Sequence, residues 1–543
     1  DGHWFLNYEY DLQSRLTAEH QGWGTLRYGY DHCGQLKTLR LPDNNRLNFH
    51  HDKGGHLATV ELNGKTLTSH LFKSGREHQR QQGQLLSHYH YDDQGRLHAH
   101  ALTQQEHRHS RRQYDYDQRG NLARTLDTRK GQHDYHYDPL DRLTRANHSQ
   151  DTQERFAHDP AGNLLMQDRI GPAVIVGNRL LLQGDRHYDY DAFGNLIRER
   201  RGRAQQLVTE YRYDCQHRLI GITQPDGRTA SYCYDPFGRR ISKNVDEKTT
   251  EFFWQGDTLI AEHSEEQHRS YLYEPDSFRP LALLEGFGPD NTQAFHYQLD
   301  HLGTPQELTA PNDETVWSAH YRAYGQIARL DINTVDNPLR FQGQYFDQES
   351  GLHYNRHRYY NPDNGRYLTP DPVKLAGGLN GYQYVPNPTG WVDPLGLSAN
   401  CPPEGKSSPA CRIPDEPAIP DLSRKGAFRQ AKRDANIPMA QEPDMVMNPN
   451  TRRVKQYGVV KMTDFNGESI LDDSGKPTNT RVYQYTRADG SKVLIQDHSA
   501  GHRYGRKDGT GDQGAHFNLR PINKPRNGKV PGVKEHYSFK DKK

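Results

Sequence analysis

Histidines gather near the C-terminus of the chain in a pattern that could cleave phosphodiester bonds. His498 follows Asp497, and His502, His516 and His536 lie in the glycine-rich and basic stretches beyond it. Phosphodiester cleavage needs a base for the attacking water, a cation at the scissile phosphate and a stabiliser of the leaving oxygen. We predict that His498 is the base and that Asp497 orients it.

The same stretch could hold one divalent metal ion, either Mg²⁺ or Zn²⁺. The predicted ligands are His502, His516 and His536, of which His516 is also a candidate catalytic residue, because imidazole nitrogens are common metal ligands. Arg503, Arg506 and Arg520 are the residues expected to meet nucleic-acid phosphates. With 31 histidines in the chain, it is their clustering beside Asp, Asn and Gly that favours a site.

Two other interpretations of this segment stay open. In a metal-independent ribonuclease, His498 and His516 would exchange protons while an RNA 2′-hydroxyl attacks the phosphate. Alternatively, the chain is a structural or adhesive protein without catalysis. Insensitivity to EDTA would identify the first, and an uncut 62.6 kDa chain without toxicity the second.

A pair of carboxylates further upstream could hydrolyse a peptide bond. Asp371 and Asp393 each precede a proline. When two carboxylates share one proton, one serves as the base for water and the other as the acid for the carbonyl. Asp-Pro pairs also occur in simple turns, and the spacing alone favours that interpretation.

Short Tyr-Asp units that recur from the N-terminus predict the elements that must position these residues. Asp117, Asp138 and Asp159 recur at one fixed spacing, which is typical of a repeat architecture. In each unit, alternating aromatics predict a strand, Asp and a left-handed Gly predict the turn, and Asn-Leu or Arg-Leu begins the returning strand. Each unit is therefore predicted to be a β-hairpin. Stacked hairpins bury apolar surface that a single hairpin would leave exposed. Asp and Arg of the unit are expected to be structural.

These units resemble the YD repeats of the Rhs, insecticidal-toxin-complex C and teneurin families over residues 1–290. The resemblance implies a mainly β fold in which hairpins spiral into a hollow shell around a cavity. A small α+β toxin domain is expected after the shell. Only 32% of the residues are hydrophobic, which agrees with a thin β architecture rather than one dense core.

Residues 291–397 resemble the Rhs-associated core domain and end in the motif Asp393-Pro394-Leu395-Gly396-Leu397. In that family the core is a self-cleaving aspartyl protease that cuts directly after this motif. The resemblance places the cut at the Leu397–Ser398 bond. It also makes Asp371 and Asp393 the catalytic carboxylates and Arg358 their supporting residue.

The sequence changes character after Leu397. Basic residues exceed acidic ones beyond this point and acidic residues exceed basic ones before it, although the net charge of the chain is only +1. Such asymmetry suggests that the C-terminal part meets a polyanion, although a solvated basic surface would look the same. Residues 398–420 are expected to be a linker, and residues 423–436 are expected to form a helix.

Residues 421–543 resemble the HNH/endonuclease VII-type toxin domains, in particular the type named for an EHHH residue set. The resemblance implies a metal-dependent nuclease that acts on DNA. Pro521 follows His516 closely and argues against the helix that closes an ordinary HNH site. Either Glu468 or Glu535 would supply the acidic residue.

The whole pattern resembles an interbacterial Rhs effector. Such a toxin would be made in the bacterial cytoplasm, secreted by a contractile secretion system and active in the cytoplasm of the target cell. The expected partners are nucleic acid, an immunity protein, and a spike protein and chaperone that bind through a missing N-terminal region. No apolar run long enough to cross a membrane occurs in the sequence, and five cysteines in so long a chain predict no disulfide framework.

Overall fold

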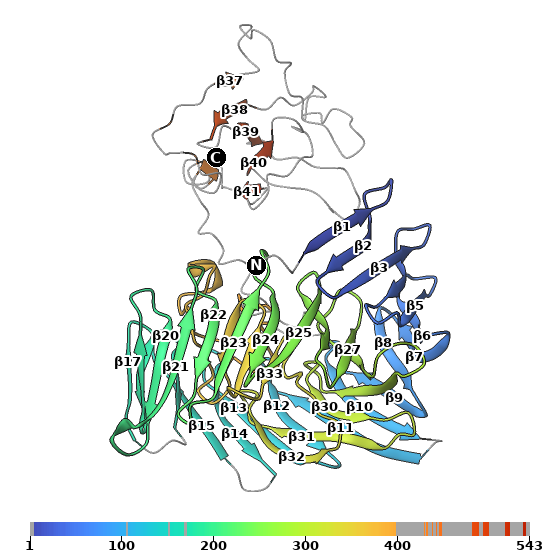
Figure 1. Ribbon diagram of the computed structural model, residues 1–543, viewed down its shortest axis with the longest axis horizontal. Helices are drawn as coiled ribbons and strands as arrows, with labels where there is room; N and C mark the ends of the chain where they lie inside the picture. The colour runs from blue at the N-terminus through green and yellow to red at the C-terminus, as the bar shows by residue number, and fades with distance from the viewer. Residues whose placement is uncertain are drawn as a thin grey trace. The chain divides into compact units, whose positions relative to one another are not determined.

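The computed structural model divides into two compact units, residues 1–413 and 414–543, which are described separately (Figure 1). The structure describes residues 5–104, 107–149, 153–167, 171–397, 428, 431–432, 437, 441, 445–447, 481–487, 492–498, 516–521 and 536–538. The predicted linker at 398–420 and most of the predicted helix at 423–436 lie outside this range.

The first unit begins with an antiparallel sheet of 16 strands in which every strand pairs with the next one along the chain. Its strands are β1 (Leu6–Tyr10), β2 (Leu16–Gln21), β3 (Gly24–Tyr30), β4 (Leu36–Arg40), β5 (Arg46–His51), β6 (Leu57–Leu62), β7 (Lys65–Lys73), β8 (Arg76–Gln82), β9 (Leu85–Tyr91), β10 (Leu97–Gln104), β11 (His107–Tyr116), β12 (Leu122–Asp127), β13 (Gly131–Tyr137), β14 (Leu143–His148), β15 (Gln153–His158) and β16 (Leu164–Met166).

A second antiparallel sheet of 16 strands follows in the same sequential order. It consists of β17 (Ala173–Val176), β18 (Arg179–Gln183), β19 (Arg186–Tyr190), β20 (Leu196–Arg201), β21 (Leu207–Tyr213), β22 (Leu219–Thr223), β23 (Thr229–Tyr234), β24 (Arg240–Val245), β25 (Lys248–Gln255), β26 (Thr258–His263), β27 (His268–Tyr273), β28 (Pro280–Glu285), β29 (Gln293–Leu299), β30 (Pro305–Thr309), β31 (Thr315–Tyr321) and β32 (Ile327–Asn333), with the short 3₁₀ segment η1 (Arg203–Gln205) after β20. The sheet runs without a break across residue 290.

A small third sheet carries the candidate site of the first unit. It comprises β33 (Tyr345–Asp347), β34 (Leu352–Asn355), β35 (Arg358–Asn361) and β36 (Arg366–Tyr367), and the 3₁₀ segment η2 (Lys374–Gly377) follows it. The third sheet packs on the second one, because Tyr345, Tyr354 and Tyr359 share a buried apolar cluster with Tyr232 and Trp254.

The predicted hairpin turns are confirmed, and one unit shows why they form. Asp117 directly follows β11, and its Oδ1 accepts hydrogen bonds from the backbone N–H groups of Arg119 and Asn121, both at 2.9 Å. Gly120 has φ = 90°, a conformation that costs glycine little. The Asp side chain thus satisfies the turn's backbone donors, as an Asx-type turn requires.

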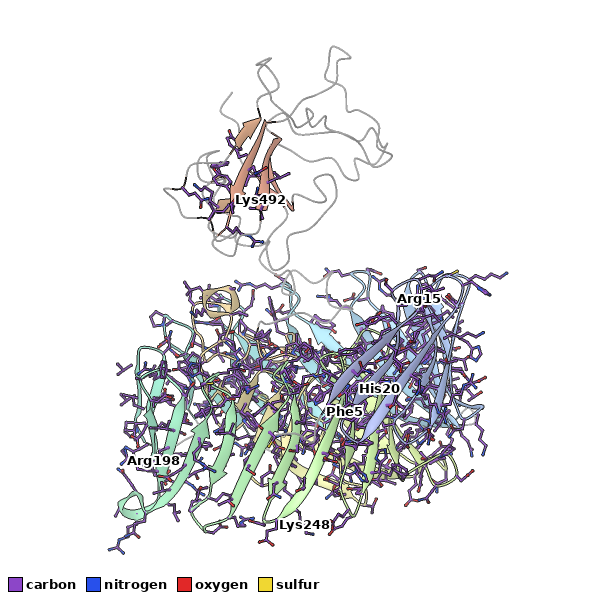
Figure 2. All side chains as sticks on the ribbon, turned by 45° about the horizontal axis from the view of Figure 1, so that its top comes forward. Phe5, Arg15, His20, Arg198, Lys248 and Lys492 are labelled. Atoms are coloured by element: carbon purple, nitrogen blue, oxygen red, sulfur yellow. The ribbon has the colours of Figure 1, made fainter. Side chains whose placement is uncertain are left out.

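In several units a tyrosine joins the unit to its predecessor. The Tyr137 hydroxyl donates to the Leu122 carbonyl at 2.6 Å, and the Tyr213 hydroxyl does the same to Leu196 at 2.8 Å. Arg15, labelled in Figure 2, lies 4.9 Å from the ring centroid of Tyr30 in the next unit. The Tyr-Asp-Arg pattern therefore makes contacts between hairpins as well as within them.

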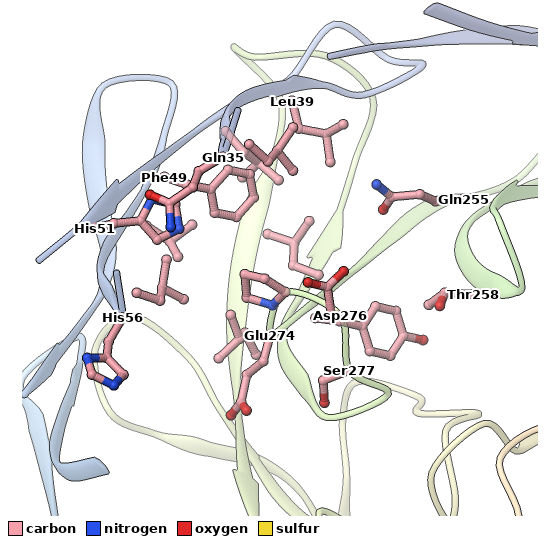
Figure 3. A pocket seen from close by; sticks show the side chains of 18 of the residues that line it. Gln35, Leu39, Phe49, His51, His56, Gln255, Thr258, Glu274, Asp276 and Ser277 are labelled. Carbon is pink, nitrogen blue, oxygen red and sulfur yellow. The ribbon is translucent and has the colours of Figure 1, made fainter. Parts of the chain in front are cut away.

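The two large sheets also pack against each other. Leu26, Leu47 and Val60 of the first sheet share a buried cluster with Phe253 and Leu284 of the second. Beside this cluster lies a cavity of about 1240 Å³ with walls from both sheets (Figure 3). Its lining mixes apolar with charged groups, among them Glu274 and Asp276.

The described part of the second unit includes a five-stranded antiparallel sheet, and residues 428, 431 and 432 are helical, as predicted for 423–436. The strands of the sheet, in sequential order, are β37 (Met445–Met447), β38 (Arg481–Thr486), β39 (Lys492–His498), β40 (His516–Pro521) and β41 (His536–Ser538). The strands β38 and β39 form an antiparallel hairpin, in which Arg481 pairs with Asp497 and Thr486 with Lys492. Tyr485, Val493 and Ile495 are buried in this sheet.

Candidate functional site

The third sheet places Arg358 and Tyr367 next to each other. Arg358 begins β35 and Tyr367 ends β36, and the guanidinium carbon of Arg358 lies 3.7 Å from the Tyr367 ring centroid. The tight turn between β34 and β35 depends on Arg356, which has φ = 43° and donates to Asp257 at 2.8 Å. This turn fixes where β35 begins and therefore where Arg358 lies.

Arg358 links the two predicted carboxylates. Its Nη2 donates to Asp371 Oδ2 at 3.0 Å and lies 3.6 Å from Asp393 Oδ2. Its Nη1 donates to the Gly381 carbonyl at 2.8 Å, and its Nε donates to the Gly396 carbonyl. The Arg358 side chain is only 1% exposed, so these contacts are made out of water, where charge interactions are strong.

Asp393 holds the end of the motif in place. Its Oδ1 accepts the backbone N–H of Leu397 at 3.0 Å, and its Oδ2 accepts the Tyr367 hydroxyl at 2.8 Å. Asn355 donates to the Asp393 backbone carbonyl at 2.8 Å. Asp393 is therefore a buried, hydrogen-bonded carboxylate that closes a turn around Leu397.

Asp371 lies in the segment between β36 and η2. Its Oδ1 accepts the N–H of Val373 at 2.9 Å, which starts the turn into η2. Burial raises the pKa of Asp371 above the usual range of a carboxyl, and Arg358 opposes part of that rise. Such a carboxyl keeps its proton at a higher pH than a solvated one does.

The carbonyl oxygen of Leu397 lies close to Asp371, with Gly377 of η2 between them. A Cβ atom built on Gly377 would lie 2.2 Å from Asp371 Oδ2 and 2.6 Å from the Leu397 carbonyl oxygen. Both oxygens therefore border the space that a side chain at residue 377 would fill.

The structure brings Arg358, Asp371, Asp393 and Leu397 into one buried site, whereas Ser398 lies outside the described residues. The sequence did not single out Tyr367, Asn355 or Gly377, which also touch this site. Tyr367 and Gly377 lie four residues before and six after Asp371 in the printed sequence, and only their proximity to that carboxyl could have suggested them.

In the second unit the backbone register brings the predicted nuclease histidines together. His498 at the end of β39 pairs directly with His516 at the start of β40, and His536 of β41 pairs with Asn518 of β40. Directly paired residues of an antiparallel sheet share a face, and strand residues alternate between faces. Positions 498, 516, 518 and 536 therefore belong to one face of the sheet.

Other predicted residues of this unit are placed differently. Asp497 pairs with Phe517 and so falls on the opposite face from His498, and its orienting role stays a prediction. Arg520 is in β40 and pairs with Leu494. His502, Arg503, Arg506, Glu468 and Glu535 lie outside the described residues.

Among the described residues, no group of three or more His, Cys, Asp or Glu side chains has a metal-binding arrangement. No helix in the described part of the chain is long and apolar enough to span a membrane. The described cysteines, Cys33, Cys215 and Cys233, are free thiols.

Two family models match the chain. The teneurin YD-shell model matches residues 76–387, and the model of HNH/Endo VII superfamily nuclease toxins matches residues 469–539. The first match covers more than half of the chain and includes the third sheet. The second match includes the strands β38 to β41.

Several relatives match most of the chain. The double-stranded DNA deaminase toxin A of Burkholderia cenocepacia is 35% identical over 435 residues, which is 73% of this chain and 30% of that protein. The probable deoxyribonuclease RhsA of Dickeya dadantii is 32% identical over 425 residues, 73% of this chain and 29% of that protein. This chain thus spans less than a third of either relative.

A solved structure shares the fold. The crystal structure of TcdB2–TccC3 without its hypervariable C-terminal region matches with a TM-score of 0.54 at 17% identity, over 72% of this chain and 23% of that one. This likeness and the two sequential antiparallel sheets confirm the mainly β fold. The chain belongs to the YD-shell family of Rhs-type polymorphic toxins and carries a C-terminal HNH/endonuclease VII-type nuclease toxin domain.

Proposed function

We propose that the first unit cuts the chain after Leu397 and so frees a nuclease toxin that acts on DNA. The observation that carries the first step is the assembly of Arg358, Asp371 and Asp393 around Leu397, the residue on the acyl side of the predicted cut. Charged groups are rarely buried together without a structural or chemical reason, and here they contact the main chain at Gly396 and Leu397.

The two carboxyl groups have different surroundings, which suggests different roles. Asp393 accepts two hydrogen bonds and lies by Arg358, which favours its ionised form. Asp371 has a raised pKa and lies close to the Leu397 carbonyl oxygen. We assign Asp393 as the base for water and Asp371 as the acid for that carbonyl.

The proposed reaction is a peptide hydrolysis. Water adds to the Leu397 carbonyl carbon and gives a proton to Asp393, while Asp371 protonates the carbonyl oxygen. The tetrahedral intermediate then collapses and breaks the bond to the Ser398 nitrogen, which leaves as the amine with a proton from Asp393. The oxygen returns its proton to Asp371, and the Leu397 carboxyl group is the new C-terminus of the first unit.

We propose the domain boundaries as 1–290 for the YD shell, 291–397 for the core, 398–420 for the linker and 421–543 for the toxin. The match to the teneurin YD-shell model supports a hollow shell that encloses a toxin. In this scheme the described sheets would form part of the wall.

For the second unit, we propose a metal-dependent endonuclease. The family match supports nuclease chemistry, and the probable deoxyribonucleases among the relatives support DNA as the substrate. His498 would accept the proton of the attacking water, with Asp497 as its predicted orienting partner. Arg503, Arg506 and Arg520 would meet the phosphates.

The register supports a divalent metal ion only by placing the imidazole-bearing positions 498, 516 and 536 on one face of the sheet, since imidazole nitrogens are common metal ligands. His516, His536 and His502 would hold Mg²⁺ or Zn²⁺. When bound, the metal would supply a Lewis acid at the scissile phosphate.

A metal-independent ribonuclease is the second candidate, and one observation favours it. His498 and His516 pair directly, as two histidines that exchange protons across one phosphate would need to lie. Sensitivity to EDTA separates this candidate from the first.

By family, we further propose delivery between bacteria by a contractile secretion system, into the cytoplasm of the target cell. A toxin protein of Pseudomonas aeruginosa, Tse5, is 37% identical over 264 residues, 42% of this chain and 20% of that protein. An immunity protein would protect the producer. A spike protein and a chaperone would bind a region outside this chain.

The test uses the full chain and its His498→Ala variant, incubated with plasmid DNA and with total RNA, in Mg²⁺ and in EDTA. Metal-dependent DNA cutting that the variant lacks supports the endonuclease, and RNA cutting that survives EDTA replaces it with the ribonuclease. If a folded chain cuts neither, the nuclease assignment fails. A gel of the same samples shows whether the 62.6 kDa chain has been cut.

A further inference from the structure

Gly377, the last residue of η2, lies next to the site around Leu397. A Cβ on this residue would lie 2.2 Å from Asp371 Oδ2, 2.7 Å from Asp371 Cγ and 2.6 Å from the Leu397 carbonyl oxygen. Real Cβ atoms are essentially never found within 3.0 Å of such neighbours. Any side chain at this position therefore collides with the proposed acid and with the proposed scissile carbonyl at once.

The need for glycine at this position is one of space. Gly377 is not among the glycines with positive φ, whereas its neighbour Gly378 has φ = 124°. The backbone of residue 377 could therefore carry an L side chain without strain. A side chain is excluded by two oxygens, Asp371 Oδ2 and the Leu397 carbonyl oxygen, which belong to segments before and after η2 in the sequence.

The two oxygens cannot move away freely. Asp371 is tied to Arg358 through Oδ2 and to the Val373 N–H through Oδ1. Leu397 is tied to Asp393 through its N–H. Because Arg358 also donates to the Gly396 carbonyl, the same guanidinium fixes both sides of the gap.

We propose that Gly377 is a positioning residue for self-cleavage, whose missing side chain lets the Asp371 carboxyl and the Leu397 carbonyl oxygen approach each other. This inference rests on the proposed self-cleavage and adds a third element to it. The η2 segment closes the site from one side, and only a bare Cα leaves room for proton transfer between acid and carbonyl.

The test compares Gly377→Ala with Gly390→Ala in the full chain. Gly390 is a matched control from the same region, because it also lacks positive φ and a Cβ there would meet only ordinary contacts, Asn387 Nδ2 at 3.5 Å being the nearest. Each chain is synthesised in a short cell-free pulse, synthesis is blocked, and the appearance of the C-terminal fragment is followed on gels.

We expect Gly377→Ala to slow the cut by about 100-fold, which is the usual order of loss when reacting groups are displaced by an ångström. Gly390→Ala should cut at the parent rate. The collision in Gly377→Ala should lower its thermal midpoint slightly, whereas Gly390→Ala should keep the parent's midpoint. If Gly377→Ala cuts as fast as the parent, or if Gly390→Ala slows the cut as much, the positioning role is wrong.

A pH series provides the readout that a merely structural lesion would not change. A methyl group at residue 377 would push Asp371 away from Arg358, the group that lowers its pKa. The alkaline limb of the rate profile should then move to higher pH, whereas general damage would lower the rate equally at every pH. An unmoved limb overturns the proposal.

Asp371→Asn separates failure of this inference from failure of the self-cleavage itself. If Asp371→Asn still cuts, the proposed chemistry is wrong. If Asp371→Asn is inert while Gly377→Ala cuts normally, only the role of Gly377 is wrong.

Discussion

Arg358 donates to the Asp371 carboxylate at 3.0 Å and also lies 3.6 Å from that of Asp393, so one guanidinium serves both predicted carboxylates. Two neighbouring carboxyl groups without a cation beside them would repel each other once both were ionised. With Arg358 between them, both groups can stay buried, and their different hydrogen bonds rather than mutual repulsion set their roles.

Replacing Arg358 by Lys should abolish self-cleavage and weaken the first unit. A single ammonium cannot reproduce the fork that reaches Asp371, Gly381 and Gly396. Lysine keeps the positive charge but leaves some of these buried acceptors without a donor, which typically costs about 1–3 kcal/mol for each. The measurement is the cut fraction on gels together with the thermal midpoint.

Arg198→Lys is the matched control for that experiment. Arg198 pairs with Glu210 at 2.9 Å, but both side chains are about half exposed. Exposed pairs contribute about 0–1 kcal/mol, so neither the cut nor the thermal midpoint should change. Normal cutting by Arg358→Lys would contradict the role given to the guanidinium.

Tyr367→Phe should slow the cut while the fold is kept. The change removes the hydroxyl that donates to Asp393 at 2.8 Å but leaves the ring that packs near Tyr360 and Tyr384. A hydrogen bond to a charged group contributes about 1.5–3 kcal/mol, which corresponds to a rate loss of about tenfold or more. Pulse synthesis followed by gels measures this loss, and an unchanged rate would exclude the hydroxyl from the site's function.

Self-cleavage should fail at alkaline pH. Burial raises the pKa of Asp371, so its acid form persists above the usual carboxyl range and disappears as the pH rises through the folded-state value. The same shift also affects stability. The contribution of Asp371 to folding is fully present when the pH is below its unfolded-state pKa, and it is lost as the pH rises through its folded-state pKa. Cleavage rates across a pH series test the assignment, and a rate that climbs steadily with pH would reverse the acid and base roles.

The large sheets should lose stability as the pH falls below the ordinary pKa of histidine. Burial lowers the pKa of His100 to about 3, and its ring stacks on Tyr89 and bonds Ser87 at 2.9 Å. The folded state therefore excludes a proton that the unfolded chain binds, which costs on the order of 1 kcal/mol per pH unit. His100→Gln should make the thermal midpoint less dependent on pH in the range between the usual pKa of histidine and the lowered pKa of His100. His50→Gln is the control, because His50 lies at a half-exposed position, and it should leave the pH dependence unchanged.

Much of the fold was predictable because its rules are local. Aromatic alternation, Asp at the strand end and a left-handed Gly determine each hairpin within a few residues, as at Asp117 and Gly120. The links between hairpins, such as that from Tyr137 to Leu122, depend on how successive hairpins align and were not foreseen.

Only the site residues that belong to the recognised family motifs could be predicted from the sequence. Asp371, Asp393 and Arg358 came from resemblance, but Tyr367, Asn355 and Gly377 enter the site through packing of separate turns. Spacing along the chain does not say which backbone will approach a carboxylate closely enough to exclude a Cβ.

The register of the second sheet leads to a last prediction about the nuclease. His498 and His516 pair directly across β39 and β40, so either imidazole removed alone should disable the same reaction. We expect His498→Ala and His516→Ala to lower DNA cutting similarly, by about 100-fold or more as general acid–base contributions usually do. EDTA should add little further loss in His516→Ala, a ligand variant, but a large one in His498→Ala.

Lys492→Ala is the control, since Lys492 lies at the far end of β39 and pairs with Thr486. If EDTA affects neither the parent nor the variants while RNA is cut, the two histidines act as an acid–base pair without metal, and their direct pairing explains why.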